Sequence, residues 1–398
     1  MIGGTPPQAT KWRKRITEDN LFIWKGCPTC HTIVFERGVV SIRKRWSREQ
    51  AWEWQERKGW IVGCNFIPSR CINNIEIWQE FEFEDVLNTI RRELQLASSI
   101  GMNSIRMLLP FYVWKHQRDG FLQRIDRVLS AADQCGISLM PIFFDDCTLP
   151  RQFHREPVFG KQRDPVPGHH GGVVHTPFDG GGKVGYNLSD DKENWPVLEE
   201  YVRDIMGTFA RDERILMWDM WNEPGNSNRN AMSMEFMIRV FEIGRSIDPI
   251  QPLTAGPWEF GDGYLRPYHG VAGLSEIEKK AMELSDVITY HYYGNKDNSI
   301  RLIQELKQEG RPLLITEWLH RPFGNEVADL LPVFKQEGVG CFNWGLVAGK
   351  TQTYEPWDAI RKIPGLDLKK WQHDLFYSDF MPYREEEIET FKELTSAR

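Results

Sequence analysis

The sequence predicts an α/β protein whose main part is a (β/α)8 TIM barrel, with a small N-terminal extension and a long loop after the third strand. The chain has 398 residues, of which 41% are apolar and 26% charged, as is typical of a folded globular protein. From residue 59 onward, short apolar runs alternate eight times with longer amphipathic segments, the pattern of strands and helices around a parallel sheet. A doubly wound sheet is the alternative, but it favours a glycine-rich first turn, and residues 63–68 do not supply one.

The apolar runs are the expected strands, and the amphipathic segments between them are the expected helices. Between residues 86 and 100, Leu87, Ile90, Leu94 and Ala97 recur at steps of three and four and form one apolar stripe. The strands are expected at 60–66, 104–108, 138–144, 215–221, 252–256, 287–292, 313–316 and 340–344. The clearest helices are expected at 86–100, 121–135, 197–209 and 234–247.

The N-terminal segment lies outside this repeat. Residues 1–58 are expected to form an extension, with a hairpin that pairs 32–35 with 39–43 and a short tryptophan-rich helix from Ser47. The barrel is then expected over residues 59–398.

A second segment outside the repeat, residues 145–193, is rich in glycine, proline and histidine. Loops of this length in a compact domain are usually functional or disordered, and because this one leaves a strand end, we expect it to cover the site. Its histidines, His169, His170 and His175, either form a metal site or belong to a mobile loop. We favour the loop, because no cysteine or carboxylate stands at ligand spacing.

Charge and hydropathy exclude several classes of protein. The net charge of −7 provides no overall basic field for nucleic acid, and no apolar run approaches the ~20 residues of a membrane helix. The cluster at Lys11–Arg15 is expected to be a solvated extension, with nucleic-acid binding or targeting as the alternative. The sixteen tryptophans indicate either a tryptophan-rich core or flat faces that stack on sugar rings.

The seven cysteines show no disulfide framework. Cys27 and Cys30 are spaced as in half of a zinc knuckle or a redox motif, but no second pair follows, so ordinary reduced thiols are expected. This usage favours a cytoplasmic protein, or a secreted one if a leader was removed.

Polar, titratable or aromatic residues follow almost every expected strand. In a TIM barrel, functional groups gather at these carboxyl ends. The candidate site residues are Asn65, Arg106, Asp145, Asp146, Asn222, Glu223, Trp258, His291, Tyr293, Glu317 and Trp344.

Two of these residues, Glu223 and Glu317, are carboxylates that close the apolar runs of the fourth and seventh strands. Two carboxyl groups facing each other across a barrel mouth suit hydrolysis of a glycosidic bond, since one can donate a proton while the other attacks the anomeric carbon. A separation of about 5–5.5 Å implies retained configuration, and about 6.5–9.5 Å implies inversion.

The run Trp221–Pro224 (Trp-Asn-Glu-Pro) resembles the fourth-strand motif of the (β/α)8 glycoside hydrolase clan that contains the family 5 cellulases and mannanases. Further strand-end residues match that clan's pattern in order and spacing: Arg106, His291, Tyr293 and Trp344. Residues 63–69 and 343–350 are similar to relatives often called 1,4-beta-xylanases. One departure is that the third strand ends in Asp145, Asp146 and Cys147, without the histidine that many family 5 members carry nearby.

The resemblance implies a retaining β-glycoside hydrolase, with Glu223 as acid/base and Glu317 as nucleophile. It implies that Arg106, Asn222, His291, Tyr293 and Trp344 hold the substrate or the two glutamates. Trp258, at the end of the fifth strand, is also expected to bind substrate. Asp145 and Asp146 either bind sugar hydroxyls or cap the loop. No cofactor is implied, because the carboxyl groups do the proton work.

The expected partner is an oligosaccharide, with no nucleic acid or membrane partner, and the covering loop favours exo action. The alternatives are an endo-acting cellulase, mannanase or xylanase, a metal-dependent hydrolase and a non-catalytic carbohydrate-binding barrel. Neither the sugar nor the oligomeric state follows from the sequence.

Overall fold

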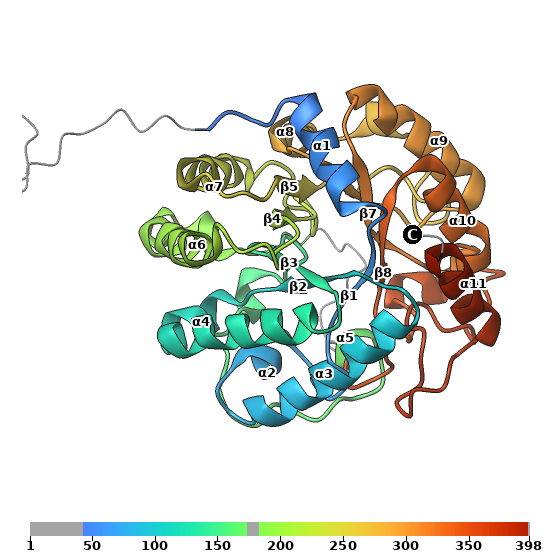
Figure 1. The fold of residues 1–398 in the computed structure, drawn as a ribbon, viewed down its shortest axis with the longest axis horizontal. Helices are drawn as coiled ribbons and strands as arrows, with labels where there is room; N and C mark the ends of the chain where they lie inside the picture. Colours follow the sequence, from blue (N-terminus) through green and yellow to red (C-terminus); the bar gives the residue numbers. More distant parts are fainter. Residues whose placement is uncertain (1–42, 173–182, 397–398) are drawn as a thin grey trace, which may run out of the picture. The chain divides into compact units, whose positions relative to one another are not determined.

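The computed structural model describes residues 43–172 and 183–396, and its eight strands form one parallel sheet in the order β5-β4-β3-β2-β1-β8-β7-β6 (Figure 1). The strands are β1 Val62–Asn65, β2 Ser104–Leu108, β3 Ser138–Ile142, β4 Trp218–Asn222, β5 Leu253–Gly256, β6 Ile288–His291, β7 Leu313–Trp318 and β8 Gly340–Trp344. The outer strands β5 and β6 also meet, because Asp286 N–H donates to the Leu253 carbonyl and His291 N–H to that of Pro257. The predicted TIM barrel is confirmed.

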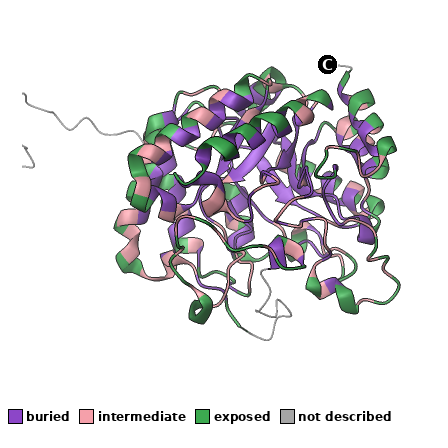
Figure 2. Ribbon diagram, turned by 90° about the horizontal axis from the view of Figure 1, so that it is seen from below, coloured by how far each residue is buried: buried purple, intermediate pink, exposed green. Residues whose placement is uncertain are grey.

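A helix follows each strand and covers the outside of the barrel. The helices are α1 Arg48–Lys58, α2 Asn74–Trp78, α3 Phe83–Ser99, α4 Phe111–Asp133, α5 His169–Gly172, α6 Trp195–Phe209, α7 Met234–Ile247, α8 Glu276–Leu284, α9 Lys296–Leu306, α10 Val327–Glu337 and α11 Glu385–Ser396. Figure 2 shows buried strands and helices whose outer faces are exposed. Among the described residues, no helix has the length and apolar character needed to cross a bilayer.

Most element bounds differ by a few residues from those predicted, and three differences affect the barrel or the site. Strand β4 begins at Trp218 instead of residue 215, because Ile215 makes only an isolated bridge to Leu139. Helix α4 begins at Phe111 instead of residue 121 and contains a non-helical residue, Gln117. Strand β7 extends to 318, so that its acidic residue lies inside the strand.

The described residues before the barrel pack against its amino-terminal end. Helix α1 begins after Ser47, whose side chain forms a capping box with Gln50. Ala51 and Trp54 of this helix belong to one buried cluster together with Met140, Leu216, Met217, Val287, Leu314 and Phe342. The compact unit therefore begins at Arg43 and not at residue 59. The predicted hairpin and the Cys27–Cys30 pair lie outside the described residues.

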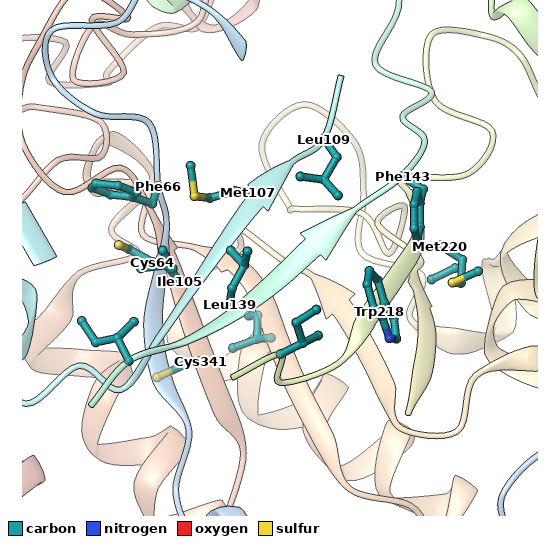
Figure 3. Close-up of a cluster of buried hydrophobic side chains, with 14 of the residues drawn as sticks. Cys64, Phe66, Ile105, Met107, Leu109, Leu139, Phe143, Trp218, Met220 and Cys341 are labelled. Atoms are coloured by element: carbon teal, nitrogen blue, oxygen red, sulfur yellow. The ribbon is translucent and has the colours of Figure 1, made fainter. Parts of the chain in front are cut away.

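Alternation along the strands separates the packing core from the site. Cys64, Ile105 and Met107 belong to the apolar layer between the sheet and the helices (Figure 3). Successive side chains of a strand point to opposite faces. Asn65, next to Cys64 on β1, and Arg106, between Ile105 and Met107 on β2, therefore point into the barrel. Polar groups therefore line the barrel interior near the carboxyl ends of the strands.

Candidate active site

The two predicted glutamates lie together at the mouth of the barrel. Glu223 directly follows β4, and Glu317 is the penultimate residue of β7. Each of the two residues is 8% exposed. One carboxylate oxygen of each, together with a ring nitrogen of His291, lies within 4.8 Å of the others. An oxygen–oxygen distance below 4.8 Å is compatible with the separation of about 5–5.5 Å between the carboxyl groups of retaining enzymes. Glu223 also has a φ of 45°, a strained conformation that is common at functional sites.

Glu317 accepts hydrogen bonds on both of its oxygens. Arg106 Nη1 donates to Oε1 over 3.1 Å, and the Tyr293 hydroxyl donates to Oε2 over 2.8 Å. Both donors favour the ionised carboxylate. These contacts suit a nucleophile that must be charged when it attacks.

Arg106 is itself held in place by three buried acceptors. Its Nε and Nη2 donate to Asp219 Oδ2 over 3.0 and 2.7 Å, Nη2 also donates to Asn222 Oδ1, and Nη1 to Asn65 Oδ1. Such a network fixes the guanidinium plane, and therefore the direction from which it reaches Glu317.

Glu223 has different partners. Its Oε1 lies 2.7 Å from His291 Nδ1, while Oε2 accepts from the thiol of Cys147 over 2.8 Å and from the amide of Asn226 over 2.5 Å. Burial lowers the pKa of His291 to about 4, so this ring is neutral near pH 7. Within the described part of the chain, no cationic side chain hydrogen-bonds to Glu223, in contrast to Glu317.

Burial raises the pKa of both glutamates. Arg106 lowers the pKa of Glu317, but burial outweighs the guanidinium, so the net shift is upward. The two carboxyls also repel each other when both are charged, so they titrate as a pair. Because Arg106 hydrogen-bonds to Glu317 and not to Glu223, we expect Glu317 to ionise first and the proton to stay on Glu223.

The predicted aromatic residues line the same mouth. Trp344 ends β8 and is half-buried, with its ring 5.8 Å from that of His170. Trp258 follows β5, also half-buried, and its backbone N–H donates to the buried carboxylate of Glu278. Their predicted stacking on a sugar stays a prediction.

The two predicted aspartates serve different purposes. Asp145 Oδ1 accepts from the side-chain amide of Asn222 over 2.8 Å and so orients that amide. Asp146 has no exposed surface and forms an ion pair with the fully buried Arg229. This burial favours a structural role for Asp146, and the binding of a sugar hydroxyl by this residue stays a prediction.

The structure also tests the metal alternatives. Both ring nitrogens of His169 are used, by the Glu355 carbonyl and the Trp357 indole, and His175 lies outside the described residues. His291 Nδ1 is only 2.7 Å from Glu223 Oε1. Two ligands of a tetrahedral zinc ion would be about 3.4 Å apart at ordinary bond lengths. The close pair is therefore a hydrogen bond and does not fit a shared metal.

Three site residues were missed by sequence reasoning: Asp219, Asn226 and Cys147. Asp219 carried a usable signal, since a charged residue inside an apolar strand must find a partner. Asn226 and Cys147 lie in loops, and nothing in their spacing indicates the contact with Glu223.

Solved structures of glycoside hydrolases share this architecture at low sequence identity. No family model and no curated protein matches the chain. The beta-1,4-mannanase of the common sea hare Aplysia kurodai is 14% identical, with a TM-score of 0.50 over 77% of this chain and 95% of that one. The exo-beta-1,4-mannosidase of Opitutaceae bacterium strain TAV5 is 17% identical, with a TM-score of 0.53 over 85% and 59%. The GH5_18 protein of Bifidobacterium longum, solved with Manβ1-4GlcNAc, is 13% identical, with a TM-score of 0.51 over 85% and 78%. The chain thus has the fold of the family 5 glycoside hydrolases.

Proposed function

We propose that this protein is a retaining β-glycoside hydrolase that cleaves β-linked oligosaccharides by double displacement. The observation that carries the proposal is the pair of buried carboxyl groups, Glu223 and Glu317, with oxygens within 4.8 Å and with unlike partners. The fold shared with a mannanase, a mannosidase and a protein solved with Manβ1-4GlcNAc supports a carbohydrate substrate.

The reaction proceeds in two steps. In the first, the Glu317 carboxylate bonds to the anomeric carbon while Glu223 gives its proton to the departing oxygen, so that a neutral alcohol leaves. In the second, the Glu223 carboxylate takes a proton from water, whose oxygen bonds to the anomeric carbon and releases Glu317. Two inversions give net retention.

We also propose exo action, on the basis of the segment after β3. Gly160 N–H donates to Gln79 near α2, and Gly171 N–H donates to Thr351 after β8. The segment thus follows the rim past the ends of β2 and β1 to β8, where His170 lies against Trp344. We infer that this segment closes one end of the substrate-binding cleft, which favours release of one or two sugars at a time.

Hydrolysis of a panel of chromogenic β-glycosides tests the activity, with β-mannosides, β-glucosides, β-galactosides and β-xylosides compared. Proton NMR of the first product tests the stereochemistry, and a first product of inverted configuration would contradict double displacement. Natural oligosaccharides of increasing length then test the mode of action. One- and two-sugar products at early times support exo action, whereas a broad ladder favours the endo alternative.

A further inference from the structure

Cys147 occupies an unusual position beside the acid/base. It follows Asp145 and Asp146 at the end of β3, where the resemblance leads one to expect a histidine nearby. Its sulfur lies 2.8 Å from Glu223 Oε2, 3.3 Å from Asn226 Nδ2 and 3.7 Å from Asn222 Nδ2. A thiol has one proton to donate and a sulfur that accepts weakly. Because both amides donate to the sulfur, the carboxylate oxygen is the acceptor for the thiol proton.

We propose that Cys147 is a positioning residue for the acid/base: its thiol donates to Glu223 Oε2 and, with the Asn226 amide, holds the carboxyl group and stabilises its charged form. The inference rests on the proposed function for its catalytic meaning, but the contact itself exists whatever the substrate is. It also gives the residue at the position of the missing histidine a defined task.

The surroundings keep the thiol protonated. Burial raises the pKa of Cys147 well above its usual value, and the carboxyl groups of Asp145, Glu223 and Glu317 raise it further. A thiol in this setting is a poor nucleophile and remains a donor across the pH range in which an enzyme works. Cys147 therefore acts through Glu223 and not on the substrate.

The donated bond matters because Glu223 must change charge within each turnover. It is protonated before the first step and ionised before the second. Burial favours the protonated form, while the two donors on Oε2 favour the carboxylate. Loss of one donor moves this balance toward the acid, so that Glu223 keeps its proton to higher pH.

Other titratable or charged groups also face Glu223, and a test must leave them in place. They are Arg106 on β2, Asp145 after β3, Glu278 on α8, His291 on β6, Tyr293 after β6 and Glu317 on β7. Substitution of Cys147 removes none of these side chains, but the Cys147 side chain also forms a hydrogen bond with Asp145. Cys147→Ser keeps a donor for both carboxyl groups, so a shift of Glu223 that is confined to Cys147→Ala reports the lost donor.

The experiment compares Cys147→Ala, which lacks the donor, with Cys147→Ser, which keeps one. Cys135→Ala removes a half-buried thiol just after α4 and serves as the control. Glutamate is labelled with ¹³C at the side-chain carboxyl, and the Glu223 signal is assigned by its loss in Glu223→Gln. We expect the pKa of Glu223 to rise by about half to one unit in Cys147→Ala, as for loss of one weak donor to a charged group. It should stay near the wild-type value in Cys147→Ser and Cys135→Ala.

The same variants are then assayed for kcat/KM against pH on a glycoside with a poor leaving group. The basic limb, which reports the proton on the acid/base, should move upward with the NMR titration in Cys147→Ala alone. An unchanged Glu223 titration in Cys147→Ala, or an equal shift in Cys147→Ser, would overturn the proposal. A wild-type protein inactive on every glycoside would instead refute the proposed function, while the NMR result would still decide the role of Cys147.

Discussion

Tyr293→Phe should move the ionisation of the nucleophile without disturbing the barrel. The substitution removes one hydroxyl donor, 2.8 Å from Glu317 Oε2, and keeps the ring that packs edge-on against Trp357. A hydrogen bond to a charged group contributes about 1.5–3 kcal/mol. At 1.36 kcal/mol per unit, that corresponds to a rise of about 1–2 units in the pKa of Glu317.

The sign follows from which form the hydroxyl stabilises. It donates to the carboxylate, so its loss favours the protonated acid and raises the pKa of Glu317. The acidic limb of kcat/KM should therefore move to higher pH. At pH values below the acidic limbs of both proteins, kcat/KM of Tyr293→Phe should be about 10- to 100-fold lower than that of the wild type.

Dinitrophenyl β-glycosides are the substrates for this assay, because a good leaving group needs no proton from Glu223 and leaves the nucleophile to set the pH dependence. Tyr292→Phe is the matched control, since that hydroxyl donates to the Gly261 carbonyl over 3.2 Å and does not contact either glutamate. An acidic limb at the wild-type position in Tyr293→Phe would refute the assigned contact.

Four other variants have defined outcomes. Glu223→Ala should keep appreciable turnover of dinitrophenyl glycosides, and azide should increase this turnover and give a β-glycosyl azide of retained configuration. Glu317→Ala should lose nearly all turnover, and azide should give at most the glycosyl azide of inverted configuration. If the two phenotypes were exchanged, the roles of the two glutamates would be reversed. His170→Ala should remove part of the rim beside Trp344 and lengthen the early products from oligosaccharides, as measured by chromatography; an unchanged product pattern would remove the basis for exo action. Burial raises the pKa of Glu93 to about 7, above the roughly 4.3 of an unfolded chain, so its contribution to stability is complete below about pH 4 and is lost as pH rises through 7. Glu93→Gln should therefore flatten the fall in Tm between about pH 5 and 8, and an unchanged slope in thermal melts would contradict this.

The barrel and its two glutamates could be predicted because both depend on local sequence. An apolar run that ends in Asn222 and Glu223 marks a strand and its carboxyl end at once, and the same holds for Glu317. The apolar stripe of α3 could be predicted for the same reason, and its four residues, Leu87, Ile90, Leu94 and Ala97, are all buried.

The finer arrangement could not be predicted, because it depends on which way each side chain points. Asp145 and Asp146 are neighbours, so they point in different directions at the strand end. Only the register of the finished barrel decides which of them meets Asn222 and which meets Arg229.

Contacts between distant segments were also out of reach. The segment of α1 carries no clear apolar stripe in sequence, and its two buried apolar residues find their partners only at the closed amino-terminal end of the barrel. In the same way, His169 accepts a hydrogen bond from Trp357, which lies 188 positions away in the chain. This contact occupies a ring nitrogen that the sequence had offered as a candidate metal ligand.

The central claim is that Glu317 forms the covalent bond to the sugar. A 2-deoxy-2-fluoro glycoside with a dinitrophenyl leaving group, of the sugar that the panel selects, should stop turnover after one equivalent of dinitrophenol. Peptide mapping by mass spectrometry of the trapped protein should then place the added sugar on Glu317. An adduct on Glu223, or hydrolysis with no adduct at any residue, would contradict the account.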